Sequence, residues 1–329
     1  MLPKDWLVRL QQKDRKSIAK LITLLEGTSL ERNEILRHIY PLVGKAHRIG
    51  ITGPPGAGKS TLISAWTTYL RSLGLTVGII AVDPSSPFTG GALLGDRVRM
   101  NRHATDHGVW MRSLSNRGVM GGLSLATHEV AHLLDVAGYD VLFLETVGVG
   151  QAELEIVHNA DTVMLVLPPG AGDGVQIAKA GVMEIADILV VNKADQPFAD
   201  RLVAELQDVL RISRKKDWTP PIIRTVASQN RGMEELWNAA QTHRGYLQEP
   251  KRASKKAENR LIQEVSLYLH QQIRLLVEEE LAKPIRRQQM KQIIQTKSSP
   301  QDLIDKWWAE GFLSYKPNTD PHSQKGGKT

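Results

Sequence analysis

The sequence predicts an α/β protein with a mostly parallel sheet covered by helices on both faces. Three observations support this fold class. Short apolar runs typical of strands alternate with helix-compatible stretches between residues 48 and 227. A glycine-rich loop follows the first of these runs, and acidic or polar residues follow several of the others. Hydrophobic residues make up 41% of the 329 residues, which is enough for a substantial core.

The first two parts of the chain differ in pattern. Residues 1–45 are expected to form an N-terminal helical extension of two or three amphipathic helices, because apolar side chains recur there at helical spacing. Residues 46–248 are expected to form the central α/β domain. Its strands are expected near residues 48–52, 76–83, 109–114, 139–147, 161–168, 187–192 and 221–227.

The third part, residues 249–329, is expected to be a C-terminal helical arm with a disordered tail. Its long helix over residues 257–295 is broken at Pro284, and a short helix begins at Ser299–Pro300. The arm has more apolar positions than one packing face needs, so we expect it to bury them in a symmetric homodimer. These positions are Leu261, Ile262, Val265, Leu267, Leu269, Ile273, Leu275 and Leu276.

Composition narrows the range of functions. The chain has no cysteine, which excludes disulfides and thiolate metal sites. No apolar run reaches the ~18 residues of a membrane span, and the first residues lack the apolar core of a signal peptide, so a cytoplasmic protein is expected. The net charge of +7 includes basic clusters at residues 251–256 and 286–291. Aromatic residues are not interleaved with them, so we expect solvated faces and no nucleic-acid partner.

A phosphate-binding motif occupies the loop after the first expected strand. The segment GPPGAGKST fits the pattern G-x-x-x-x-G-K-[ST], which indicates a P-loop NTPase. Its glycines let backbone N–H groups surround a phosphate, Lys59 neutralises β- and γ-phosphate oxygens, and Ser60 can hold Mg²⁺. A plain turn before a helix would explain the glycines but not the Lys-Ser pair. The expected nucleotide contacts are Gly53, Pro54, Pro55, Gly56, Ala57, Gly58, Lys59, Ser60 and Thr61.

Carboxylates at strand ends predict where the metal ion lies. Asp83 ends the second expected strand and Glu145 the fourth, while Asp96 lies in a loop between them. In a parallel sheet these ends lie beside the phosphate loop, so all three could hold Mg²⁺ together with Ser60. Each carboxylate could instead cap a helix or start a turn. The loop after Gly148 is expected to act as a switch.

The segment Asn192-Lys193-Ala194-Asp195 predicts which nucleotide base is bound. It matches the N-K-x-D element of GTP-binding proteins. Guanine presents two donors, N1–H and the N2 amino group, which the carboxylate of Asp195 can accept together. Adenine would leave that carboxylate without a matching donor, so the site is expected to prefer GTP. Ser228, at the end of the last expected strand, is a further candidate for contact with the base.

The order of the segments GPPGAGKST, AVDPSSPFTGGALLGDRVRM, ETVGVGQAE, LPPGAGDGVQIAKAG and NKAD resembles the MeaB/ArgK family of P-loop GTPases over almost the whole chain. The resemblance implies a homodimer joined through C-terminal helices. It also implies a chaperone that protects and loads an adenosylcobalamin-dependent mutase, typically methylmalonyl-CoA mutase. Some members have been described as ATPases or kinases of a basic amino acid transport system, which is the alternative function.

The resemblance also assigns roles to residues. The residues expected to be catalytic are Lys59, Glu145, Gln176 and Lys179. The last two lie in a mobile loop over residues 170–179 and are expected to reach the nucleotide. Residues Ser60, Asp83, Asp96 and Glu145 are the implied metal ligands. No glutamine stands immediately after the switch glycine, so a low intrinsic rate of GTP hydrolysis and activation by a partner are expected.

A competing motif is the literal H-E-x-x-H sequence from His128 to His132. Two histidines at this spacing could bind Zn²⁺, with Glu153 or Glu155 as a third ligand, as in a metalloprotease. The alternative, which we favour, places both histidines on the partly exposed face of a helix whose apolar side packs on the sheet.

Overall fold

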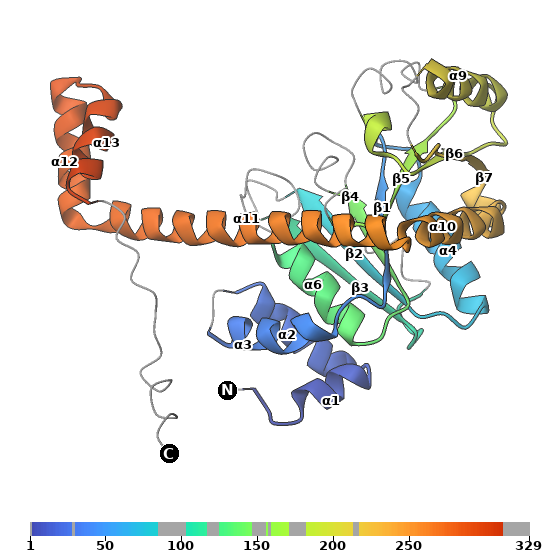
Figure 1. The fold of residues 1–329 in the computed structure, drawn as a ribbon, viewed down its shortest axis with the longest axis horizontal. Coiled ribbons are helices and arrows are strands. Elements are labelled where there is room, and N and C mark those ends of the chain that lie inside the picture. Colours follow the sequence, from blue (N-terminus) through green and yellow to red (C-terminus); the bar gives the residue numbers. More distant parts are fainter. Residues whose placement is uncertain are drawn as a thin grey trace. The chain divides into compact units, whose positions relative to one another are not determined.

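The computed structural model describes residues 2–27, 30–84, 103–116, 125–146, 156, 159–170, 182–212 and 217–311. The chain forms two compact units, Met1–Gln263 and Glu264–Thr329. The first unit contains the N-terminal helices together with the sheet and the helices that cover it (Figure 1). The three-part organisation expected from the sequence remains a proposal.

The first unit is built on a parallel sheet, which in the described residues has seven strands (Figure 1). The strand order is β3-β2-β4-β1-β5-β6-β7, and every described neighbouring pair is parallel. All seven expected strands are present, with ends shifted by a few residues at most. Their bounds are β1 (His47–Thr52), β2 (Val77–Pro84), β3 (Val109–Asn116), β4 (Val141–Thr146), β5 (Thr162–Leu167), β6 (Ile188–Asn192) and β7 (Ile222–Thr225).

Helices cover both faces of the sheet, as expected. One face packs against α4 (Lys59–Ser72) and α10 (Met233–Leu247), and the other against α6 (Leu125–Val136) and α9 (Ala199–Ile212). The alternation of side chains along β4 explains this arrangement: Phe143 lies in the core beside α4, whereas Leu142 and Leu144 lie in the core beside α6. Short 3₁₀ helices η1 (Tyr40–Leu42), η3 (Val182–Ile185) and η4 (Ala227–Gln229) join the larger elements.

The N-terminal extension consists of α1 (Trp6–Gln11), α2 (Arg15–Leu25) and α3 (Leu30–Ile39), which confirms the expected helices. Their apolar faces share one core with α6. Helix α6 is therefore buried on two sides, by the sheet and by the extension, and all its residues except Ala126 are buried.

The expectation that His128 and His132 lie on a partly exposed face is wrong, because the N-terminal helices cover α6. The two histidines are only 1% and 4% exposed. Glu129 accepts hydrogen bonds from Arg32 Nε at 3.0 Å and Nη2 at 2.5 Å, and His132 Nδ1 accepts one from Arg48 Nη2 at 2.9 Å. Among the described residues, no group of three or more His, Cys, Asp or Glu side chains could hold a metal ion. The motif therefore holds the N-terminal extension on the sheet.

Helix α11 (Pro250–Ala282) begins seven residues before the expected start at Ala257. The reason is that Pro250 occupies the first helical position, where its missing N–H costs nothing, so the helix starts at this proline. Helix α12 (Pro284–Thr296) follows the expected break, and α13 (Pro300–Ala309) begins after Ser299, whose side chain accepts the N–H of Gln301. The expected disordered tail lies outside the described residues.

The second unit is held together by Arg286 of α12. Its guanidinium donates to Glu310 at 2.6 Å and lies 5.0 Å from the centre of the Trp307 ring. The indole N–H of Trp307 donates to Gln289 at 2.7 Å. Trp307 is buried, whereas Trp308 is 58% exposed. The described part of the unit thus has a small core around Trp307, and several of its apolar side chains are exposed.

Candidate nucleotide-binding site

The phosphate loop connects β1 to α4 at the carboxyl edge of the sheet. Two positions of this loop require glycine for two reasons. A Cβ atom would collide with neighbouring atoms, and the backbone φ is positive. At Gly53, with φ +142°, a Cβ atom would lie 2.1 Å from the carbonyl oxygen of Val166. At Gly58, with φ +87°, it would lie 2.6 Å from Nδ2 of Asn192. The loop therefore packs against β5 and β6 so closely that a side chain at either position would displace it.

Lys59 is the first residue of α4 and is only 7% exposed. Its ammonium donates to the carbonyl oxygens of Gly53 at 2.7 Å and Pro54 at 3.2 Å, so its side chain links the end of the loop to its start. Gly58 has no side chain that could cap α4, which leaves the N–H groups of the first helical turn for an anion. The charge and the N–H groups together suit a phosphate. Within this loop and turn, Pro55 and Thr61 are exposed.

Ser60 and Glu145 meet beside the loop. The hydroxyl of Ser60 donates to Oε1 of Glu145 at 2.6 Å, and Glu145 is 6% exposed. The strand register places Glu145 opposite Ile51 of β1 and Ala81 of β2. Residue 83 lies two positions further along β2, so its backbone is at the same edge of the sheet. The side chain of Asp83 and all of Asp96 lie outside the described residues.

The Ser60–Glu145 pair fits a magnesium ion. Mg²⁺ binds hard oxygen ligands at about 2.0–2.1 Å in octahedral geometry, so neighbouring ligands are ~2.9 Å apart. The two oxygens are already 2.6 Å apart and need to separate only slightly to hold an ion between them. Magnesium usually keeps several waters and binds through one or two carboxylates plus substrate phosphates, so a larger acidic cluster is not needed.

The base motif is joined to the phosphate loop through Asn192. Its side-chain amide donates to the carbonyl oxygen of Ala57 at 2.9 Å. Its oxygen accepts from the hydroxyl of Thr225 at 3.1 Å and from the N–H of Ala227 at 3.3 Å. Asn192 is therefore bonded to both the phosphate loop and the loop after β7. The role of Thr225 was not anticipated, although its hydroxyl at the end of a strand beside the base segment is a usable signal.

Lys193 and Asp195 complete the described part of the base motif. Lys193 has a left-handed backbone, with φ +57°, and its ammonium donates to the carbonyl oxygen of Gly56 at 2.8 Å. Asp195 is exposed and lines an open pocket of about 430 Å³. Ser228 is also exposed, one residue beyond Ala227. The pocket is lined by Ala194, Asp195, Arg224, Thr225, Val226, Arg231, Gly232 and Glu235, of which Arg224, Thr225, Arg231, Gly232 and Glu235 were not anticipated.

The structure thus brings together most of the expected site at one edge of the sheet. Lys59, Ser60, Glu145 and Asn192 are linked to the loop or to one another by hydrogen bonds. Gln176 and Lys179, and the expected switch after Gly148, lie outside the described residues. A phosphate loop, an acidic strand end and a guanine motif on a parallel sheet define the class: a P-loop nucleotide-binding protein with the features of a GTPase.

Comparison with known proteins agrees with this class. The family described as "Methylmalonyl Co-A mutase-associated GTPase MeaB" matches residues 18–284. A putative GTPase of Pyrococcus horikoshii is 53% identical over 270 residues, which cover 80% of this chain and 85% of that protein. GTPase ArgK of Escherichia coli is 40% identical over 240 residues, covering 70% of this chain and 72% of that protein.

Among solved structures, one of a LAO/AO transport system kinase aligns with a TM-score of 0.67 and 26% sequence identity, over 95% of this chain and 100% of that one. The chain belongs to the MeaB family of GTPases, as the segment order indicated. The expected GTPase activity follows from that membership. In the part of the chain that the structure describes, no helix has both the length and the apolarity to cross a membrane.

Proposed function

We propose that this GTPase is a Mg²⁺-dependent chaperone of an adenosylcobalamin-dependent methylmalonyl-CoA mutase, gating cofactor loading and protecting the mutase. The observation that carries the proposal is the family match over residues 18–284, because the family is described as mutase-associated. The guanine motif supports the nucleotide, and the contact of Ser60 with Glu145 supports the metal. The expected site of action is the cytoplasm.

In the proposed reaction, water attacks the γ-phosphate of GTP and the products are GDP and phosphate. Lys59 and the N–H groups of the phosphate loop stabilise the charge that develops on the phosphate oxygens. Ser60 and Glu145, with Asp83 and Asp96, would hold Mg²⁺, which supplies further positive charge when bound. Gln176 and Lys179 would approach the nucleotide from their loop. The intrinsic rate is expected to be low and to rise when a partner supplies or orders groups at the site.

Base recognition in this proposal depends on the two ends of the N-K-x-D motif. Asp195 accepts N1–H and the N2 amino group of guanine. Asn192 holds the phosphate loop and the loop after β7 in a fixed relative position, because its side chain forms hydrogen bonds with Ala57, Thr225 and Ala227. Ser228 lies at the start of that second loop and would contact the base from the other side.

We further propose that the chain is a homodimer formed through its C-terminal helices. Many apolar side chains of α11, α12 and α13 are exposed, and a second copy would cover them. They include Leu261, Ile262, Val265, Leu269, Ile273, Leu275, Ile285, Ile294, Ile304 and Trp308, each between 39% and 76% exposed.

Light scattering tests the dimer. We expect twice the chain mass of 36.5 kDa. Leu269→Glu is expected to weaken association, because it places a charge among the apolar positions, while the matched control Gln272→Glu changes an exposed polar residue of the same helix and keeps the dimer. A monomer at micromolar concentration, or a Leu269→Glu protein that stays dimeric, contradicts the proposal.

The chaperone proposal is tested by mixing the purified chain with purified methylmalonyl-CoA mutase in the presence of GDP or a non-hydrolysable GTP analogue. We expect a complex whose affinity depends on the nucleotide, and faster GTP hydrolysis when the mutase is present. The variant Lys59→Ala serves as a control, since its response to nucleotide is expected to be lost. Absence of a complex with either nucleotide refutes the chaperone proposal and leaves the GTPase assignment standing.

A second candidate function is a cytoplasmic ATPase or kinase of a basic amino acid transport system. The similarity to the solved structure of a LAO/AO transport system kinase favours it. The two candidates differ in nucleotide. Preference for ATP over GTP by the purified chain would favour the transport function, whereas preference for GTP would count against it.

A further inference from the structure

The first turns of α11 are bound to the GTPase fold through Asp161, at the opposite end of the strands from the nucleotide site. Asp161 directly precedes β5. Its carboxylate accepts the backbone N–H of Arg48 at 2.9 Å and the guanidinium of Arg260 at 2.6 Å. Its backbone carbonyl oxygen accepts the ammonium of Lys256. These charges lower the pKa of Asp161 despite its burial, so the carboxylate is ionised and paired.

A buried polar chain lies beside this contact. Nε2 of His47 is 2.8 Å from the hydroxyl of Thr162, which is 2.9 Å from Nδ1 of His243. Nε2 of His243 is 3.3 Å from a carboxylate oxygen of Asp187. Burial lowers the pKa of His47 to about 4 and that of His243 to about 3, so both rings are neutral at pH 7. His243 then donates to Asp187, Thr162 to His243, and His47 to Thr162, which orders the start of β5.

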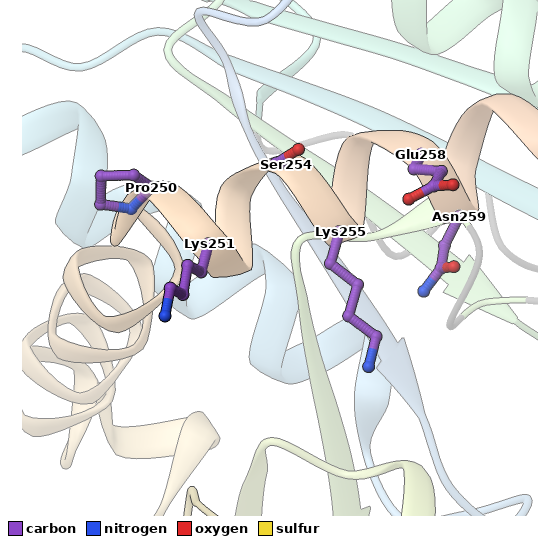
Figure 2. Close-up of a pocket in the computed structure, with 6 residues that line it drawn as sticks. All are labelled: Pro250, Lys251, Ser254, Lys255, Glu258 and Asn259. Carbon is purple, nitrogen blue, oxygen red and sulfur yellow. The ribbon is translucent and has the colours of Figure 1, made fainter.

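Only one face of α11 makes these contacts. Arg252, Lys256 and Arg260 follow one another at intervals of four residues and therefore share a face of the helix. Arg252 lies 4.0 Å from the centre of the Tyr246 ring, so this residue too is held by the fold. In contrast, Lys251 and Lys255, which lie about 100° around the helix from Arg252 and Lys256, are exposed and line an open pocket of about 670 Å³ (Figure 2).

Although Asp161 lies at the opposite end of the strands, it is connected to the nucleotide-binding edge of the sheet through β1. Ile156 and Ala160, which lie between β4 and β5 in the sequence, pack over β1 at Gly50. A Cβ atom at Gly50 would lie 2.6 Å from a side-chain carbon of Ile156 and 2.9 Å from Cβ of Ala160. The N–H of Asp161 donates to the carbonyl oxygen of Arg48 at 2.7 Å. Ile156, Ala160 and Asp161 are therefore packed on β1 without free space, and β1 leads directly from Arg48 to the phosphate loop at Gly53.

We propose that Asp161, Lys256 and Arg260, which we term the α11 latch, couple the nucleotide state of the site to the docking of α11. The inference rests on the proposed nucleotide site. A shift of β1 when the phosphate loop binds GTP instead of GDP moves Arg48, and with it Asp161, and so changes the latch. By reciprocity, weakening the latch changes the relative affinities of the two nucleotides.

The test uses the full chain. Affinities for GDP and for a non-hydrolysable GTP analogue are measured first, and amide hydrogen exchange of residues 250–263 is then compared between the two complexes. We expect the exchange of this segment to differ between the nucleotides in the natural protein. Arg260→Gln is expected to abolish that difference and to change the ratio of the two affinities about fivefold or more. The matched control Lys255→Gln, on the exposed side of α11, is expected to keep both.

The outcomes separate the latch from the nucleotide site. Equal exchange with both nucleotides, or an unchanged affinity ratio in Arg260→Gln, overturns the latch while leaving the GTPase site intact. Absence of binding by either nucleotide overturns the site and the latch together. Arg260→Lys keeps the positive charge and is expected to retain part of the coupling. It also serves as the second variant if circular dichroism shows that Arg260→Gln does not fold.

Discussion

The ion pair between Arg32 and Glu129 is predicted to be one of the strongest single determinants of stability in the first unit. The side chains are 7% and 0% exposed and are joined by two hydrogen bonds, of 2.5 and 3.0 Å. Glu129→Ala leaves the guanidinium of Arg32 buried without this partner. Removing one member of such a pair costs about 3–5 kcal/mol, which is a large fraction of the ~5–15 kcal/mol that stabilises a typical domain.

Chemical denaturation and thermal unfolding measure this loss. At about 2–4 °C for each kcal/mol, Glu129→Ala is expected to lower the melting temperature by at least ~6 °C. The matched control is Glu205→Ala, which breaks the ion pair of Glu205 with Arg201 on the surface of α9, where the side chains are 34% and 75% exposed. That change is expected to cost less than ~1 kcal/mol, because exposed pairs contribute little.

Two further results check the reasoning. The double variant Arg32→Met with Glu129→Leu is expected to recover most of the lost stability, because an apolar pair needs no charge partner. Addition of a metal chelator is expected to leave the melting temperature unchanged. A loss below ~1 kcal/mol in Glu129→Ala would refute the structural role of the pair, and a loss of stability with chelator would revive the zinc interpretation of the H-E-x-x-H motif.

Three other predictions concern the site and its supports. Lys59→Ala is expected to lower the rate of GTP hydrolysis about 100- to 1,000-fold with an unchanged circular dichroism spectrum, and an unchanged rate would contradict the role of Lys59. Thr225→Val removes a donor to Asn192 and is expected to weaken GTP binding about 2- to 10-fold in titration calorimetry, with Thr242→Val, on the exposed side of α10, as the neutral control. The free energy of unfolding is expected to fall as pH drops from about 6.5 towards 4, on the order of 1 kcal/mol per pH unit for each of His47 and His243. In that range the unfolded chain binds protons at these histidines and the folded chain does not, since their folded pKa values are about 4 and about 3. A stability that does not change between pH 7 and 5 would contradict this assignment.

The sheet and the phosphate loop could be predicted because their signals are local. Each strand is a short apolar run bounded by turn residues, and the spacing of Gly53, Gly58, Lys59 and Ser60 is fixed by the geometry of one loop. The structure adds the reason for two of the glycines, which approach Val166 and Asn192 too closely for a side chain.

The remaining features could not be predicted because they depend on contacts between distant parts of the chain. Arg32 and Glu129 are 97 positions apart, and nothing in either local pattern shows that an N-terminal helix covers α6. Read alone, His128 and His132 favour the partly exposed face of a helix over a zinc site, and no local pattern shows that they are buried. Asp161 and Arg260 are 99 positions apart, so the docking of α11 was also invisible in the sequence.

The most direct test of the account is the nucleotide preference of the chain and of Asp195→Asn, measured as hydrolysis of GTP, xanthosine triphosphate and ATP. The natural protein is expected to prefer GTP, because the carboxylate of Asp195 accepts two guanine donors. The variant is expected to lose about 10- to 100-fold in affinity for GTP, from ~1.5–3 kcal/mol for a charge-assisted pair. It is expected to gain activity with xanthosine triphosphate, because the C2 carbonyl of xanthine can accept a hydrogen bond from the Asn amide. A natural protein that prefers ATP, or a variant with unchanged preference, would contradict the assignment of Asn192–Asp195 as the guanine-binding element.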